Sequence, residues 1–123
     1  ALSGGLGAGK TTLARAILAS LGHPGEVPSP TFTIIESYDA PPLVMPAVHA
    51  DFYRLEDPAE IAEIGLDDYR EGAVLIAEWP ECAGGFAHEP ACLDITLKPR
   101  AKDAEEGRIA IVKGGSDWLG RMP

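Results

Sequence analysis

The sequence predicts an α/β domain with a mixed central β-sheet, flanking helices and a C-terminal antiparallel hairpin. Three observations support this fold class. A glycine-rich segment at residues 4–12 lies between the end of an apparent strand and an amphipathic helix. The apolar run at residues 73–77 has the length and composition of a buried strand. Two segments with alternating apolar residues, 92–98 and 108–113, have the pattern of paired strands.

The glycine-rich segment fits the phosphate-binding loop pattern G-x-x-x-x-G-K-[ST], with Gly4, Gly9, Lys10 and Thr11 at its defined positions. Glycines let the backbone curl so that successive N–H groups form a concave nest for a polyphosphate, at the N-terminus of the following helix. The pattern therefore predicts a P-loop NTPase-like fold. Lys10 would bind the β- and γ-phosphates, and the Thr11 hydroxyl would bind magnesium.

The first half of the chain supplies one helix and two further strands. Residues 1–3 are typical of the last step of a buried strand, and residues 12–21 place their apolar side chains on one helical face. Residues 32–38 are rich in β-forming residues. The apolar run 43–50 is interrupted by Pro46, which favours an edge strand or the start of a strand.

A second helix is predicted to start within residues 57–60. Asp57 can cap the helix, Pro58 suits its first position, and Glu60 would complete a capping box. The helix should end near Gly65, and residues 66–69 are expected to add one further turn.

The length of 123 residues indicates a single domain, residues 1–123, with one modest core. Only the end of the strand before the phosphate-binding loop is present, so we expect an N-terminal strand and segment to be missing. No apolar run approaches the length of a transmembrane helix. The two cysteines, Cys82 and Cys92, lack zinc-ligand spacing and are expected to be reduced thiols of a cytoplasmic protein.

The charge balance argues against direct binding of nucleic acid. The net charge is −9, from 19 acidic and 10 basic residues, and the basic residues are scattered along the chain. A basic protein partner would match this charge better.

Phosphoryl transfer also needs a carboxylate near magnesium and a group that orients the nucleophile. Glu78 follows the apolar run 73–77, as a Walker B acid would, and Asp51 follows the run before it. Both acids are therefore expected at strand ends beside the phosphate-binding loop. The alternatives are a helix or turn cap for Asp51 and a solvated strand-end charge for Glu78.

Three further residues have two interpretations each. Trp79 either belongs to the core or packs near the nucleotide. Thr31, after a proline, is either a switch residue that senses the γ-phosphate or a hydroxyl at the start of a strand. Arg54 pairs either with an acid of the site or with a surface carboxylate.

Five short sequence blocks follow one another along the chain. They are LGAGKTT at residues 6–12, SPTFT at 29–33, HADFYRL at 49–55, EIGLDDY at 63–69 and EWPE at 78–81. The phosphate-binding loop alone indicates only a superfamily, whereas the other blocks are more specific. Together they resemble the TsaE family, formerly called YjeE.

The resemblance implies a bacterial ATPase needed for threonylcarbamoyladenosine modification of tRNA, next to the anticodon. It implies partners, the TsaD protein and its dimer partner TsaB, which the family member binds and resets with ATP between turnovers. Contact with tRNA would then be indirect, through that complex, and no membrane would be involved.

The resemblance also implies roles for individual residues. ATP or ADP would be bound by Gly7, Ala8, Gly9, Lys10, Thr11, Thr12, Thr31 and Trp79. Magnesium would be bound by Thr11 and Glu78, and the residues expected to matter for hydrolysis are Lys10, Asp51 and Glu78. The family commonly has an acid where this chain has Gly5, but activity should persist because backbone N–H groups hold the phosphate.

Two other function classes remain open at this point. A small-molecule kinase would use the same loop, although no arginine cluster typical of a phosphate-clamping lid is visible. A nucleotide-gated binding module with negligible turnover differs from an ATPase only in degree. A GTPase is disfavoured, because the sequence contains no Asn-Lys-x-Asp motif for reading guanine.

Overall fold

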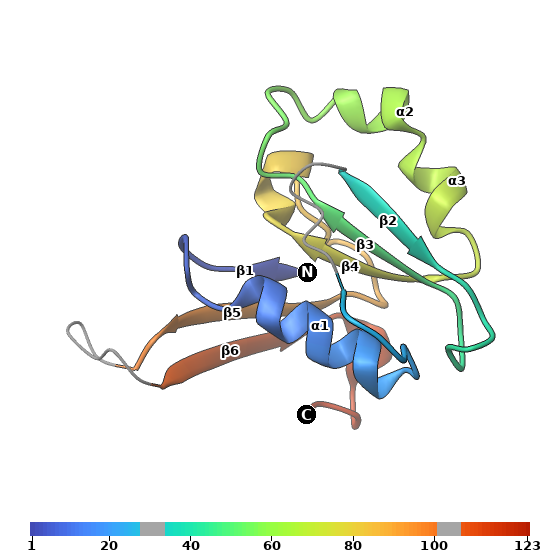
Figure 1. Ribbon diagram of the computed structural model, residues 1–123. Helices are drawn as coiled ribbons and strands as arrows, with labels where there is room; N and C mark the ends of the chain where they lie inside the picture. Colours follow the sequence, from blue (N-terminus) through green and yellow to red (C-terminus); the bar gives the residue numbers. More distant parts are fainter. Residues whose placement is uncertain (28–33, 101–106) are drawn as a thin grey trace.

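The computed structural model describes residues 1–27, 34–100 and 107–123. Its core is a six-stranded sheet in the order β2-β3-β4-β1-β5-β6 (Figure 1). The strands are β1 (Leu2–Ser3), β2 (Ile35–Tyr38), β3 (Ala47–Asp51), β4 (Val74–Glu78), β5 (Leu93–Pro99) and β6 (Arg108–Gly114).

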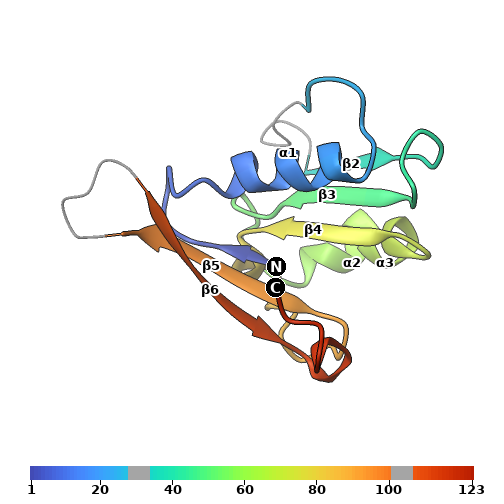
Figure 2. The same cartoon turned by 90° about the horizontal axis from the view of Figure 1, so that it is seen from below.

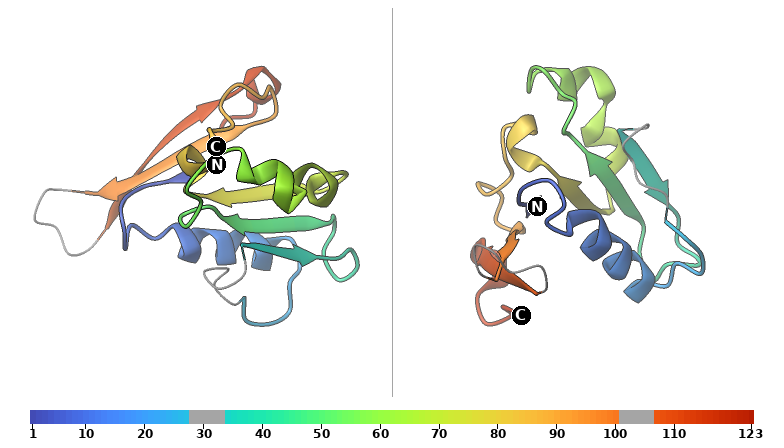
Figure 3. Two further views of the ribbon diagram at one scale, coloured as in Figure 1. Left: turned by 90° about the horizontal axis from the view of Figure 1, so that it is seen from above. Right: turned by 60° about the vertical axis from the view of Figure 1, so that its left-hand side comes forward.

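The sheet is mixed, as predicted. Strands β3, β4, β1 and β5 run parallel in its centre. Strand β2 pairs antiparallel with β3 at one edge, and β6 pairs antiparallel with β5 at the other. Figures 2 and 3 show the β5–β6 hairpin at its edge of the sheet, which confirms the predicted C-terminal hairpin.

Helices cover both faces of the β3–β4 half of the sheet (Figure 2). Helix α1 (Lys10–Ser20) packs through Ala14 and Leu18 against a core that includes Leu2 and Ile76. The short helices α2 (Glu60–Ile64) and α3 (Leu66–Arg70) lie on the opposite face. Two single-turn 3₁₀ helices, η1 (Pro80–Ala83) and η2 (Ser116–Trp118), complete the described elements.

The alternation of β4 produces two cores. Ile76 belongs to the cluster under α1, whereas its neighbour Ala77 packs with Phe52 and Leu66 on the other face. Successive strand residues point to opposite faces, so a parallel strand covered on both sides needs a continuous apolar run. The run at 73–77 is continuously apolar, which is why the sequence predicted a buried strand there.

Two predicted boundaries were wrong by a few residues. Helix α1 begins at Lys10 rather than residue 12, because the phosphate-binding loop leads directly into it. Helix α2 begins at Glu60 rather than at Pro58. The Asp57 carboxylate accepts a hydrogen bond from the backbone N–H of Ala59 at 2.9 Å, so it closes a turn before the helix instead of forming a capping box.

Other boundaries agree with the prediction. Pro46 directly precedes β3, which confirms the strand-start interpretation. Its carbonyl accepts a hydrogen bond from the Val74 N–H at the start of β4, at 3.0 Å. Gly65, with φ 78°, separates α2 from the additional turn α3. None of the helices in the described ranges has both the length and the apolar character needed to cross a membrane.

Candidate functional site

The phosphate-binding loop, the start of α1 and the ends of β3 and β4 enclose a cavity of about 380 Å³. The strand ends meet there because β3 and β4 run parallel, with Asp51 directly opposite Glu78 in the register. Of the predicted site residues, Thr31 lies outside the described residues. All the others line the cavity, namely Gly7, Ala8, Gly9, Lys10, Thr11, Thr12, Asp51, Glu78 and Trp79.

The Lys10 side chain is buried at the floor of the loop, with 5% of its surface exposed. Its ammonium group donates hydrogen bonds to the backbone carbonyls of Gly4 and Gly5, both at 2.8 Å. The same nitrogen lies 4.2 Å from the centre of the Trp79 ring, within cation–π distance. A positive charge is therefore fixed inside a loop of backbone amides, which is an arrangement suited to binding phosphate.

Glu78 is almost fully buried, with 2% of its surface exposed, so it is not a solvated strand-end charge. Its Oε1 accepts a hydrogen bond from the Thr11 hydroxyl at 2.7 Å, and its Oε2 accepts one from His49 Nε2 at 2.6 Å. Burial alone would raise the pKa of the Glu78 carboxyl group. The hydrogen bonds from His49 and Thr11, with the nearby charge of Lys10, outweigh burial and lower the pKa below its usual value.

Asp51 both closes a turn and lines the cavity. Its Oδ1 accepts a hydrogen bond from the backbone N–H of Tyr53 at 3.0 Å, which agrees with the turn-cap interpretation. Burial is the largest influence on its carboxyl group and raises the pKa, and the negative charge of Glu78 raises it further. Asp51 and Glu78 thus have pKa values displaced in opposite directions at adjacent strand ends.

The raised pKa of Asp51 predicts that Asp51→Asn stabilises the protein at pH 8. Because folding favours the protonated carboxyl group, ionised Asp51 opposes folding, and Asn can still accept the Tyr53 hydrogen bond. The cost is absent below the ordinary pKa of 3.8 and grows as the pH rises through the window between that value and the raised one. Thermal unfolding in EDTA at several pH values should show a gain at pH 8 that vanishes near pH 3.5.

The control is Asp68→Asn, which changes an exposed carboxylate on α3. Exposed surface substitutions usually change stability by less than about 0.5 kcal/mol. A lower unfolding temperature for Asp51→Asn than for the unchanged protein at pH 8 would contradict the prediction.

Trp79 has the backbone of a strained residue. It is the only non-glycine residue with positive φ in the described part of the chain, at φ 53° and ψ 52°. Such a conformation costs about 1–3 kcal/mol and persists only where the surroundings impose it. Here it turns the ring toward Lys10, and the ring centre lies 4.8 Å from that of Tyr53. Trp79 is therefore half-buried at the cavity wall rather than in the core.

Comparison with known proteins agrees with this geometry. Residues 1–109 match the family model described as "Threonylcarbamoyl adenosine biosynthesis protein TsaE". The chain belongs to the TsaE family. That match includes the phosphate-binding loop, both acids at the strand ends and the first residues of β6.

Individual TsaE relatives are similar over part of their length. The chain is 43% identical over 89 residues to the TsaE protein of Haemophilus influenzae, covering 72% of this chain and 55% of that protein. It is 47% identical over 79 residues to the TsaE protein of Bacillus subtilis, covering 63% of this chain and 48% of that one. The chain thus spans about half the length of these curated relatives.

A solved structure supports the fold. The crystal structure of Bacillus subtilis YdiB superposes with a TM-score of 0.68 at 31% sequence identity. The superposition covers 97% of this chain and 70% of that one. The P-loop NTPase-like fold predicted from the sequence is thereby confirmed.

The sequence did not predict four residues at this TsaE site. Leu6 and Tyr53 line the cavity, and His49 and Arg108 contact residues that line it. His49, inside β3, donates to Glu78. Arg108, at the start of β6, donates from Nε to the Ala8 carbonyl at 3.2 Å and from Nη2 to the Gly7 carbonyl at 3.4 Å. The i, i+2 spacing of His49 and Asp51 places both on one face of the strand, so His49 had a readable signal. Arg108 had none, because it lies about a hundred residues from the loop it contacts.

Arg54 also lines the cavity, with an exposed side chain. No ion pair joins Arg54 to an acid within the described ranges, so the structure supports neither the pairing with a site acid nor the pairing with a surface carboxylate.

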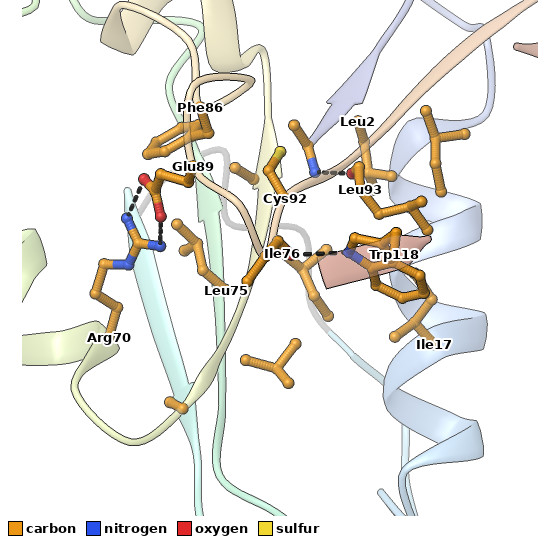
Figure 4. A pocket seen from close by; sticks show the side chains of 16 residues that line it. Leu2, Ile17, Arg70, Leu75, Ile76, Phe86, Glu89, Cys92, Leu93 and Trp118 are labelled. Atoms are coloured by element: carbon orange, nitrogen blue, oxygen red, sulfur yellow. Dashed lines mark hydrogen bonds and ion pairs between the residues drawn. The ribbon is translucent and has the colours of Figure 1, made fainter. Parts of the chain in front are cut away.

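A second cavity of about 380 Å³ lies among β4, β5 and the C-terminal segment (Figure 4). Its lining is mainly apolar and includes Leu75, Leu93 and Trp118. The ion pair between Arg70 and Glu89, at 2.6 Å, lies at one side of it (Figure 4). Neither Lys10 nor any residue of the loop at 4–9 lines this cavity.

Proposed function

We propose that this domain binds ATP or ADP with Mg²⁺ in the cavity beside the phosphate-binding loop and hydrolyses ATP. The observation that carries the proposal is the hydrogen bond between the Thr11 hydroxyl and the buried Glu78 carboxylate, at 2.7 Å. It joins the residue after the loop lysine to an acid at the end of a neighbouring parallel strand, which is how P-loop enzymes build a magnesium site.

The residues present fit the proposed ion and nucleotide. Magnesium prefers oxygen ligands, and Thr11 and Glu78 offer a hydroxyl and a carboxylate ionised at neutral pH. Bound magnesium would supply neutralisation of the phosphate charge. Lys10 and the loop amides would hold the phosphates, and Trp79 would pack near the nucleotide. Thr31 keeps its proposed role in sensing the γ-phosphate.

Asp51 is the proposed group that orients the attacking water. It ends β3 opposite Glu78 and lines the same cavity. Because the pKa of Asp51 is raised and that of Glu78 is lowered, Asp51 is the stronger proton acceptor of the two carboxylates. A division of labour follows, in which Glu78 stays ionised for magnesium and Asp51 holds the water.

The biological role follows from family membership. The relatives named above are described as tRNA threonylcarbamoyladenosine biosynthesis proteins. We propose that this chain, as part of its whole protein, supports that modification in the cytoplasm, as an ATPase that acts on the TsaB–TsaD pair. Its net charge of −9 supports contact with tRNA through those partners rather than directly.

The test is ATP hydrolysis by the full-length protein, with and without purified TsaB and TsaD. We expect slow turnover alone and a clear increase when the pair is added. Turnover that ignores the pair would contradict the proposed partners while leaving the ATPase activity intact. Nucleotide binding without any turnover under both conditions would favour the gated binding module, and phosphorylation of a metabolite in a substrate screen would favour the kinase.

A further inference from the structure

His49 is the most deeply buried ionisable residue near the site. It lies in the middle of β3, and none of its surface is exposed. Within the described residues, the single hydrogen bond of its ring joins Nε2 to Glu78 Oε2 at 2.6 Å. Its other nitrogen, Nδ1, is buried without a partner there. Because an ionised carboxylate only accepts hydrogen bonds, Nε2 must be the donor.

The sheet register explains how this contact arises. His49 is opposite Ile76 and Asp51 is opposite Glu78, so His49 and Glu78 are diagonal neighbours on adjacent strands. Their side chains share the face of the sheet on which Ile76 packs beneath α1. Glu78 therefore receives one hydrogen bond from His49 of the neighbouring strand β3 and one from Thr11 of helix α1.

The two carboxylate oxygens of Glu78 consequently have different partners. Oε2 is held by His49, and Oε1 is held by Thr11, which lines the cavity. The terminal torsion of a glutamate is broad, so an unsupported carboxylate would sample many orientations. A hydrogen bond to one oxygen from a wholly buried, packed ring removes that freedom.

We propose that His49 is a positioning residue that fixes the Glu78 carboxylate so that Oε1 faces Thr11 and the magnesium site. The proposal rests on the proposed function, because it assigns Glu78 to that site. Groups that hold metal-ligating carboxylates typically contribute about 10- to 100-fold to metal affinity. A histidine that merely satisfied a buried acid would affect stability but not the magnesium requirement of a folded protein.

The experiment compares His49→Leu with His49→Gln in the full-length protein. The glutamine amide nitrogen can occupy about the position of Nε2 and donate to Oε2, whereas leucine cannot donate. The readouts are the Mg²⁺ concentration for half-maximal ATP hydrolysis, ADP affinity with Mg²⁺ and in EDTA, and the thermal unfolding temperature. Two control variants are Val48→Ala, at a buried neighbouring position of β3, and His88→Leu, at an exposed histidine.

We expect His49→Leu to raise the half-maximal Mg²⁺ concentration by about tenfold or more. ADP affinity in EDTA should change little, and His49→Gln should recover most of the loss. Val48→Ala should lower the unfolding temperature without changing the Mg²⁺ requirement. An unchanged requirement in folded His49→Leu, or no recovery in His49→Gln, would overturn the proposal.

Two further comparisons keep the test decisive. If His49→Leu does not fold, His49→Asn replaces it, because the shorter amide cannot reach Oε2, and the same difference from His49→Gln is expected. If the unchanged protein shows no Mg²⁺-dependent nucleotide binding, the proposed function fails. If that binding is present and His49 variants leave it unaltered, only the positioning role fails.

Discussion

Lys10→Ala is expected to lower both ATP affinity and ATP hydrolysis by at least about a hundredfold. Each hydrogen bond from a charged group contributes about 1.5–3 kcal/mol, and two such bonds to phosphate oxygens correspond to a factor of at least about 100. The ammonium group has three N–H donors, and two of them bond to the Gly4 and Gly5 carbonyls, so at least one of these bonds is exchanged for a phosphate oxygen on binding. The side chain is already buried beside Trp79, so little side-chain entropy opposes that exchange.

The measurement must separate the lost charge from a disturbed loop. Lys10→Met retains an unbranched apolar stem against Trp79 but removes the charge. It should therefore lose about as much ATP affinity as Lys10→Ala, and it should unfold at a higher temperature than Lys10→Ala. Lys113→Ala is the control, because it removes an exposed lysine on β6. Unchanged ATP affinity in both Lys10 variants, measured by titration calorimetry, would mean that the phosphate site is elsewhere.

The sequence predicted the parts of the site that depend on local pattern. The loop motif located Lys10 and Thr11, and the apolar run before Glu78 located the acid at its strand end. Parallel pairing of β3 and β4 then brings Asp51 opposite Glu78 without further information. Each of these steps follows from spacing along the chain and from the geometry of parallel strands.

The remaining contacts depend on tertiary packing. The stacking of Trp79 on Lys10 requires a left-handed backbone before a proline, which sequence rules disfavour. Arg108 reaches the loop only because β5 pairs with β1 and carries β6 beside it. The late start of α2 likewise reflects competition, since the Asp57 side chain closes a local turn.

The backbone conformation of Gly4, the first glycine of the loop pattern, also depends on tertiary packing. Gly4 has φ +145°, and a Cβ atom placed on it would lie 2.6 Å from the Leu97 carbonyl oxygen and 3.0 Å from the Ala8 side chain. Leu97 cannot easily retreat, because β5 is paired with β1 on one side and β6 on the other. The loop is therefore pressed against the backbone of β5 at a point where only glycine fits.

Gly4→Ala is accordingly expected to destabilise the protein by about 1–3 kcal/mol and to abolish measurable nucleotide binding. The loop must move away from β5 to admit the methyl group, and the carbonyl of Gly4 that holds the Lys10 ammonium moves with it. Thermal unfolding and nucleotide titration of the same preparations would measure both effects.

Gly5→Ala is the matched control, one residue further along the same loop. A Cβ atom on Gly5 would meet no atom within 4 Å, and its backbone lies outside the left-handed region. Substitution of a compatible glycine by alanine typically stabilises by about 0.4–1 kcal/mol through the unfolded chain. We therefore expect Gly5→Ala to keep nucleotide binding and stability, so equal losses in the two variants would contradict the contact between the loop and β5 as the cause.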